Sequence, residues 1–159
     1  MRVGLGYDVH RLVPDRPLVL GGVTVPFEKG LLGHSDADVI SHALGDALLG
    51  AAALGDLGAH FPDTDPRWKD ISSLTLLEEV GRLIRSYSFR IVNVDATLVA
   101  EEPRIGPHVP EMRRRLAEAL GVSPEQISIK ATTTEGLGPV GAGQGMAAYA
   151  AAVIEEAGR

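Results

Sequence analysis

The sequence predicts one α/β domain spanning residues 1–159, and three observations support this prediction. Segments rich in β-forming residues alternate with amphipathic helical segments along the chain. A chain of 159 residues, 45% of them hydrophobic, suits one domain that is large enough to bury a core. The sequence contains neither internal repeats nor a linker-like run. We therefore expect one continuous core.

The first predicted elements are a strand and a hairpin. The opening strand is expected to end at about His10. Two β-rich triplets, Leu18–Leu20 and Val23–Val25, flank a Gly-Gly pair, which is typical of a hairpin. Residues Pro26–Gly33 are expected to form a loop.

A long helix and a long loop follow. The helix is predicted over about Asp38–Leu54, with Ser35 or Asp36 as its N-cap. The stretch Gly55–Lys69 is rich in Pro, Gly and Asp, which predicts a polar loop. Long loops inside compact domains are often functional.

The second half of the chain predicts two more helices and two or three strands. Helical spacing of apolar residues indicates a helix over Ser73–Ser86, and an Arg-rich helix is expected over about Pro110–Leu120. Alternating patterns indicate strands over Phe89–Val99 and Ile127–Ala131. Segment 146–157 is open to both interpretations, because alanine favours a helix whereas the β-α-β alternation favours a strand.

Composition excludes several classes of protein. A net charge of −6 argues against non-specific binding of nucleic acid. No apolar run reaches the roughly 18 residues of a membrane span, and the strand pattern begins too early for a signal peptide. Zero cysteines exclude a disulfide framework and a thiol nucleophile. We expect a cytoplasmic enzyme or binding protein.

Three residues have the types and spacing of a metal site. Asp8 and His10 stand two apart, so a strand places both side chains on the same face. His42, from the first predicted helix, would complete a set of three ligands. Three N/O ligands with an open fourth position are typical of catalytic zinc. The D-x-H pattern alone is common, so the metal site needs support from other segments.

Residues around His42 offer partners for its second ring nitrogen. Asp38 and Asp46 lie four residues on either side of it, hence on the same helix face. Zinc-bound imidazoles usually donate that N–H to a carboxylate or carbonyl, and either aspartate could accept it. The alternative is a solvated helix face on which Asp38 only caps the helix.

Four other segments carry candidate functional motifs. His34 precedes a helix N-terminus, where phosphate binds readily, although it could also only pack on a loop. Phe61–Asp65 could form an Asx-turn. Lys130–Glu135 ends in a carboxylate that could bind Mg²⁺ with substrate phosphates, whereas its threonines could simply end a strand. Gly136–Gly141 matches G-x-G-x-x-G, but too few residues follow for a dinucleotide-binding unit.

Taken together, these segments resemble the 2-C-methyl-D-erythritol 2,4-cyclodiphosphate synthase family over nearly the whole chain. The matching motifs are Gly6–His10, Gly30–Asp36, Asp46–Asp56, Phe61–Asp65 and Lys130–Glu135. Several long motifs in the right order are far more specific than any one of them. The resemblance implies an α/β sandwich, in which helices pack on one face of a mixed β-sheet, and a homotrimer with active sites between adjacent subunits.

The resemblance also implies roles for individual residues. Asp8, His10 and His42 would bind Zn²⁺, and His34 and Thr133 would stabilise the transition state. Glu135 would hold Mg²⁺ or Mn²⁺ on the substrate diphosphate. The implied substrate-binding residues are Asp8, Val9, His10, His34, Ser35, Asp56, Leu57, Gly58, Phe61, Pro62, Asp63, Thr64, Asp65, Ala100, Glu101, Glu102, Pro103, Arg104, Ile105, Gly106, Thr132, Thr133, Thr134 and Glu135. Family members often have a lysine where Arg104 stands.

The implied reaction is an intramolecular cyclisation in the non-mevalonate pathway of isoprenoid biosynthesis, catalysed by a phosphorus–oxygen lyase. The 2-phosphate of 4-diphosphocytidyl-2-C-methyl-D-erythritol 2-phosphate attacks the β-phosphorus and expels CMP. A phosphate monoester has a second pKa of about 6, so the nucleophile is already anionic near neutral pH. The alternatives are a zinc-dependent phosphoester or pyrophosphate hydrolase, and a non-catalytic module that binds a diphosphate.

The glycine-rich loop departs from the family pattern. Family members that carry an isoprenoid diphosphate in the cavity along the trimer axis have an aromatic residue and an arginine there. This chain has Pro139 and Ala142 instead, and Gly136–Gly145 contains neither Lys nor Arg. Alanine cannot supply the fork of donors that pairs with a diphosphate. We expect weak or no binding of isoprenoid diphosphate in that cavity.

Overall fold

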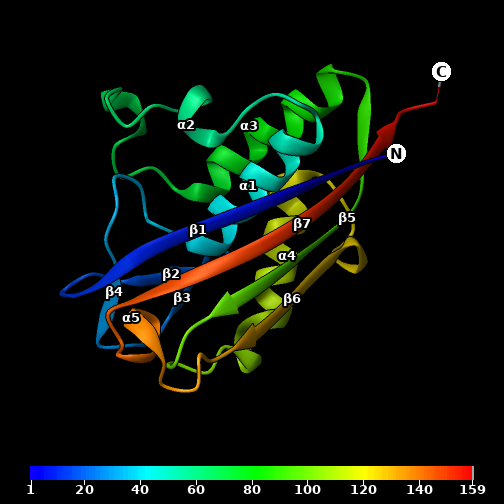
Figure 1. Cartoon of the computed structure of the whole chain (residues 1–159). Coiled ribbons are helices and arrows are strands. Elements are labelled where there is room, and N and C mark those ends of the chain that lie inside the picture. Colours follow the sequence, from blue (N-terminus) through cyan, green and yellow to red (C-terminus); the bar gives the residue numbers. More distant parts are fainter. Residues whose placement is uncertain (159) are drawn as a thin grey trace.

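The computed structural model describes residues 1–158, in which helices α1, α3 and α4 cover one face of a mixed five-stranded sheet (Figure 1). The strands are β1 (Arg2–Pro14), β2 (Leu18–Leu20), β3 (Val23–Val25), β4 (Lys29–Leu31), β5 (Phe89–Val99), β6 (Ile127–Thr132) and β7 (Gly145–Glu156). The α-helices are α1 (Val39–Ala51), α2 (Leu57–His60), α3 (Ser73–Ser86), α4 (Val109–Leu120) and α5 (Gly138–Gly141). Short 3₁₀ helices are η1 (Pro66–Trp68), η2 (Gly106–His108) and η3 (Pro124–Gln126). The predicted fold class is confirmed.

The sheet has the strand order β4-β1-β7-β5-β6. The β5–β6 pair is parallel and the other neighbours are antiparallel, while β2 and β3 form the separate hairpin that the Gly-Gly pair predicted. β7 lies in the middle and pairs with β1 on one side and β5 on the other. This double pairing explains why the alanine-rich segment 146–157, which the sequence left open, is a strand.

Helix α1 lies unusually close to β1 because Gly4 and Gly6 have no side chains. A Cβ atom built on Gly6 would lie 1.9 Å from the carbonyl oxygen of Ala43, and one on Gly4 would lie 1.9 Å from that of Ala47. The inner face of β1 can therefore touch the helix backbone. This contact brings the start of α1, with His42, next to the strand residues that follow Gly6.

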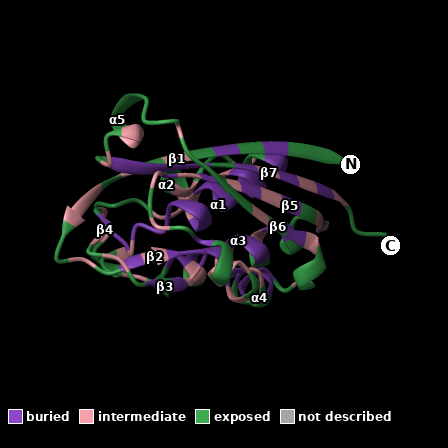
Figure 2. Ribbon diagram, turned by 90° about the horizontal axis from the view of Figure 1, so that it is seen from below, coloured by how far each residue is buried: buried purple, intermediate pink, exposed green. Residues whose placement is uncertain are grey.

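The opposite face of β1 is apolar and exposed (Figure 2). Val3, Leu5, Tyr7 and Val9 are 50–79% exposed, and Tyr149 of β7 packs its ring 5.0 Å from that of Tyr7. Five large apolar side chains on one sheet face form a patch of the kind that marks an interaction surface. We call Val3, Leu5, Tyr7, Val9 and Tyr149 the outer apolar face.

Several local expectations were wrong. The predicted loop Pro26–Gly33 contains β4, which forms because β1 continues past His10 and pairs with it. The predicted loop Gly55–Lys69 contains α2 and η1, and the glycine-rich loop contains α5. Asp38, rather than Ser35 or Asp36, is the N-cap of α1, and the helix ends at Ala51.

None of the helices within residues 1–158 is both long and apolar enough to cross a membrane.

Candidate metal centre and substrate cavities

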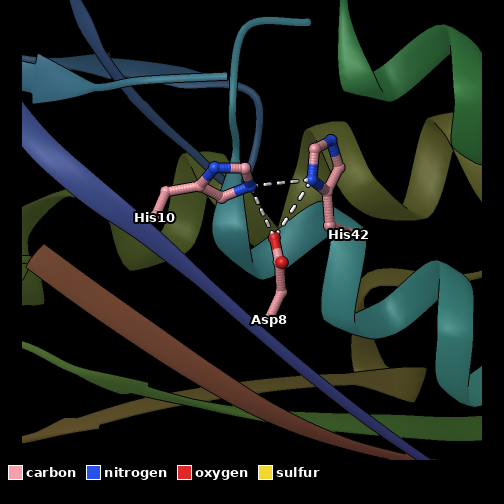
Figure 3. Close-up of side chains that lie close together, drawn as sticks. All are labelled: Asp8, His10 and His42. Carbon is pink, nitrogen blue, oxygen red and sulfur yellow. Dashed lines mark hydrogen bonds and ion pairs between the residues drawn. The ribbon is translucent and has the colours of Figure 1, made fainter. Parts of the chain in front are cut away.

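The three predicted metal ligands lie together (Figure 3). Asp8 and His10 project from the inner face of β1, and His42 projects toward them from the start of α1. Asp8 Oδ2 lies 2.9 Å from His10 Nε2 and 3.0 Å from His42 Nδ1, and the two nitrogens are 3.3 Å apart. One atom from each residue therefore faces a common point, as a shared metal ion would require.

Charge at this cluster favours an ionised Asp8. Burial by itself would raise the pKa of Asp8, but hydrogen bonds from His10 and His42 outweigh it and lower that pKa to about 2. Burial likewise acts to lower the pKa of His10, whereas the hydrogen bond and charge of Asp8 raise it overall. The carboxylate is thus anionic at neutral pH, the form that binds metal.

The second ring nitrogen of each histidine, which faces away from the cluster, also has hydrogen-bond partners. His10 Nδ1 lies 2.8 Å from the carbonyl oxygen of Leu32, which only accepts, so Nδ1 carries a proton and Nε2 is the nitrogen that can bind a metal ion. His42 Nε2 faces the hydroxyls of Ser73 at 2.9 Å and Ser35 at 3.1 Å. Backbone and hydroxyl partners of this kind fix how a ligating histidine is oriented. Two imidazole nitrogens and one carboxylate oxygen suit a divalent transition metal with an open coordination position.

The prediction that Asp38 or Asp46 orients His42 is wrong. Asp38 is buried at the N-cap of α1, where its carboxylate accepts hydrogen bonds from Gly21 N, Gly22 N, Ser41 N and Ser41 Oγ at 2.7–3.1 Å. It therefore anchors the β2–β3 turn to the helix. Asp46 accepts from the backbone N–H of Leu57 at 2.8 Å and so holds the start of α2. Helical spacing could not reveal the backbone donors of Gly21, Gly22 and Leu57, which come from other segments.

The metal cluster opens into a cavity of about 700 Å³. This cavity, which we call the metal cavity, is lined by Asp8, His10, Gly33, His34, Ser35, His42, Asp46, Asp56, Leu57, Gly58, Phe61, Pro62, Asp63, Thr64, Trp68 and Leu76. It thus collects the predicted residues from segments 34–35, 56–58 and 61–64. Within residues 1–158, the buried indole N–H of Trp68 has no hydrogen-bond partner.

Three of these lining residues, Gly33, Trp68 and Leu76, were not predicted as site residues, and Gly33 stood only within the family motif Gly30–Asp36. Trp68 is the only tryptophan of the chain and stands in a polar loop, a signal that could have drawn attention to it. Leu76 fitted the apolar face of its helix, so nothing in the pattern separated it from core residues. Two expected residues lie elsewhere: Val9 is on the outer apolar face, and the carboxylate of Asp65 caps η1 and pairs with Arg67.

Most of the other predicted substrate residues line a second cavity of about 470 Å³, the nucleotide-side cavity, whereas Thr134 and Glu135 do not. It is lined by Leu98, Ala100, Glu101, Pro103, Arg104, Ile105, Gly106, Val109, Ile129, Lys130, Ala131, Thr132 and Thr133. Its two loops are joined because a carboxylate oxygen of Glu101 accepts from Thr134 N at 2.8 Å and from Thr134 Oγ1 at 3.0 Å. Glu102 lines a smaller, separate pocket. Glu135 stands two residues after Thr133, and its backbone is in the left-handed conformation. Its N–H donates a hydrogen bond to Thr133 Oγ1 at 3.1 Å.

One chain does not bring the two halves of the expected site together. His34 lies in the metal cavity, whereas Thr133 lies in the nucleotide-side cavity. The two groups expected to act on one transition state are therefore in different cavities of the same chain.

Comparisons with known proteins identify relatives over the full chain. A family model described as the YgbB family matches residues 1–155. A protein of Desulfatibacillum aliphaticivorans named 2-C-methyl-D-erythritol 2,4-cyclodiphosphate synthase is 64% identical over 98% of this chain and 100% of its own length. The solved structure of a 2C-methyl-D-erythritol-2,4-cyclodiphosphate synthase in its CDP-bound form has a TM-score of 0.88 at 38% identity, covering 97% of this chain and 100% of that one. The bifunctional IspDF of Campylobacter jejuni gives a TM-score of 0.94 at 39% identity over 98% of this chain, which spans 42% of that longer protein.

Proposed function

The chain belongs to the YgbB family, and from this membership we propose that it converts 4-diphosphocytidyl-2-C-methyl-D-erythritol 2-phosphate to 2-C-methyl-D-erythritol 2,4-cyclodiphosphate and CMP. Residues 1–159 act as a single catalytic domain. The observation that carries the proposal is the convergence of Asp8, His10 and His42 at a cavity built from the segments of the family motifs. High identity to a named synthase over the full length supports the same activity.

The metal of this centre is Zn²⁺ in our proposal. Two neutral imidazole nitrogens and a carboxylate are a common ligand set for catalytic zinc, and the cavity leaves room for substrate at the open position. When bound, zinc acts as a Lewis acid that neutralises charge on a phosphate oxygen. The low pKa of Asp8 keeps this ligand ionised, so binding requires no proton to leave it at neutral pH.

The protein groups position the reacting phosphates. In the reaction, an oxygen of the 2-phosphate bonds to the β-phosphorus, the bond from that phosphorus to the bridging oxygen breaks, and CMP leaves with the electron pair. Such phosphoryl transfer depends mainly on alignment and charge neutralisation. His34 and Thr133 are proposed to donate hydrogen bonds to the oxygens on which charge develops. Glu135 holds Mg²⁺ or Mn²⁺ on the diphosphate, where one carboxylate plus substrate oxygens is a usual arrangement.

The walls of the metal cavity favour cyclisation over hydrolysis. Phe61, Trp68 and Leu76 give it an apolar side, and the ring of Trp68 packs edge-on against that of Phe61. A bound methylerythritol unit would fill this side and leave less room for water. The alternatives, a zinc-dependent hydrolase and a non-catalytic diphosphate-binding module, do not account for the family membership.

A homotrimer with active sites between subunits follows from the same proposal. The metal cavity and the nucleotide-side cavity hold complementary halves of the expected site. The outer apolar face offers a surface through which copies can associate. The shared site therefore explains both the split between the cavities and the exposed apolar residues.

Product analysis tests the reaction. The protein is incubated with the cytidyl substrate, Zn²⁺ and Mg²⁺, and the products are identified by ³¹P NMR. Cyclic diphosphate plus CMP is the expected result. Linear phosphates would instead support a hydrolase, and no turnover would support a binding module.

Subunit mixing tests the shared site. His42→Ala damages the metal cavity and Thr133→Ala damages the nucleotide-side cavity. Each variant alone should be nearly inactive. Co-expressed in equal amounts, the two should regain about one quarter of wild-type activity, because each site draws its halves from two chains with independent odds of about one half. Mixed assemblies that stay as inactive as the single variants would show that the halves do not combine across subunits.

A further inference from the structure

The outer nitrogen of His42 has two possible hydrogen-bond acceptors and only one proton to give. Ser73 Oγ lies 2.9 Å from His42 Nε2, and Ser35 Oγ lies 3.1 Å from it. If Nδ1 faces a metal ion with its lone pair, Nε2 must carry the proton. The question is which hydroxyl accepts it.

Asp36 determines the direction of the Ser73 hydroxyl. One carboxylate oxygen of Asp36 is hydrogen-bonded to Ser73 Oγ, and the other accepts from Ser73 N at 3.0 Å. An ionised carboxylate is only an acceptor, so the Ser73 hydroxyl must donate to Asp36. The lone pairs of Ser73 Oγ are then left for the N–H of His42. The chain of donors runs from His42 through Ser73 to Asp36.

The position of Ser73 is fixed by the fold. Ser73 is the first residue of α3 and is 1% exposed. The segments 34–36 and 70–73 are tied together, since Asp36 N donates to Ile71 O at 3.1 Å and Asp70 N donates to His34 O at 2.9 Å. The loop that carries His34 and the start of α3 therefore form one unit, and Ser73 has little freedom to turn away.

Ser35 is bonded differently. Its oxygen accepts from the backbone N–H of Ala37 at 3.2 Å. Because no carboxylate takes its proton, the Ser35 hydroxyl keeps that proton for a partner in the metal cavity, which it lines. This leaves Ser35 suited to donate to a substrate oxygen, and leaves the proton of His42 to Ser73.

We propose that Ser73, oriented by Asp36, is a positioning residue that accepts the Nε2 proton of His42 and so turns the Nδ1 lone pair toward the metal. The inference rests on the proposed metal centre and adds what fixes the tautomer of its third ligand. His10 is fixed in the same way by the carbonyl of Leu32. Partners of this kind typically change metal affinity 10- to 100-fold when they are removed.

Chelator competition with Zn²⁺ tests the proposal in three variants. Ser73→Ala should weaken zinc binding roughly 10- to 100-fold. Ser35→Ala should keep the affinity within about twofold while raising KM, since its hydroxyl is assigned to substrate. Ser72→Ala is the matched control, because Ser72 caps α3 through Leu74 N but has no contact with His42 among the described residues. It should lower the Tm and leave zinc affinity unchanged.

The proton on His42 Nε2 is read by ¹⁵N NMR of the zinc-loaded protein. In the wild type this N–H should exchange slowly with water, and Ser73→Ala should speed the exchange. The proposal is overturned if Ser73→Ala binds zinc like the wild type, if Ser72→Ala loses as much affinity, or if the loss belongs to Ser35→Ala. If the wild type binds no zinc, the proposed metal centre fails; if it binds zinc and Ser73→Ala binds it equally well, only the role of Ser73 fails.

Discussion

Adding one methyl group at Gly6 should separate helix α1 from strand β1 and damage the metal centre. The Cβ of Gly6→Ala would lie 1.9 Å from the carbonyl oxygen of Ala43, whereas ordinary contacts begin at 3.4 Å, so the two elements must part by up to the difference of about 1.5 Å. Both sides of the clash are backbone, which cannot rotate away. Overpacking typically costs about 1–3 kcal/mol, and alanine returns about 0.5–1 kcal/mol as the better strand former. Because both sides of this clash are backbone, the cost lies at the upper end of that range, and we expect the free energy of unfolding to fall by about 2 kcal/mol.

The same displacement should reach the metal ligands, because His42 is the neighbour of Ala43. Sites need their ligands within about 0.5 Å of the productive geometry, so a shift of about 1.5 Å should cost at least about tenfold in metal affinity. Urea titration of the metal-free protein, at one fixed protein concentration, measures the free energy of unfolding. Chelator competition measures the affinity for the metal ion.

Gly50→Ala is the matched control. It makes the same change in α1, where the nearest atom to the new Cβ would be Leu5 O at 3.9 Å. Alanine in a helix should raise the free energy of unfolding by about 0.5–1 kcal/mol and leave metal binding unchanged. If Gly6→Ala unfolds at the same urea concentration as the wild type and keeps its metal affinity, the close contact does not set the geometry of the centre.

Four further predictions concern the metals and the cavity along the axis of the proposed trimer. His42→Ala should lose zinc and activity together, because two ligands cannot hold the ion as three do; elemental analysis showing full zinc occupancy would refute the centre. Glu135→Gln should weaken the Mg²⁺ dependence of turnover while zinc stays bound, and loss of zinc would mean that the two metals were misassigned. Although burial opposes it, Asp8 raises the pKa of His10 above its usual value, so protons should compete for this ligand and zinc affinity should fall as the pH is lowered through that raised pKa; an affinity independent of pH would contradict this. Because Gly136–Gly145 has no Lys or Arg, native mass spectrometry should find no isoprenoid diphosphate on the purified protein, and one bound per trimer would falsify the argument.

The sequence could predict the features that depend on local spacing. Period-two alternation placed Asp8 and His10 on one face, and capping and helical periodicity predicted the bounds of α3 correctly. The metal cluster was predictable in the same way. Asp8 and His10 share one face of β1, so only one close approach, that of α1 with His42, is needed to complete it. That approach depends on Gly4 and Gly6, whose close contact with α1 no local pattern predicts.

What the sequence could not predict depends on contacts between distant segments. Asp38 faces the N–H groups of the β2–β3 turn and not His42, because an N-cap residue leaves the helical conformation. The hydroxyl that meets His42 comes from Ser73, which lies 31 residues away. The division of the site into two cavities is likewise a property of the folded chain, since no spacing rule states which loops share a cavity.

If copies associate through the outer apolar face, as proposed, this protein's behaviour depends on its concentration. Association that covers Val3, Leu5 and Tyr7 involves folded copies and not unfolded ones, so mass action makes the Tm rise with the amount of protein present. Activity obeys the same law if each site draws residues from two chains. Near the dissociation constant of the assembly, halving the amount of enzyme removes more than half of the working sites. A cell that makes this protein sparingly would therefore lose flux faster than it loses protein.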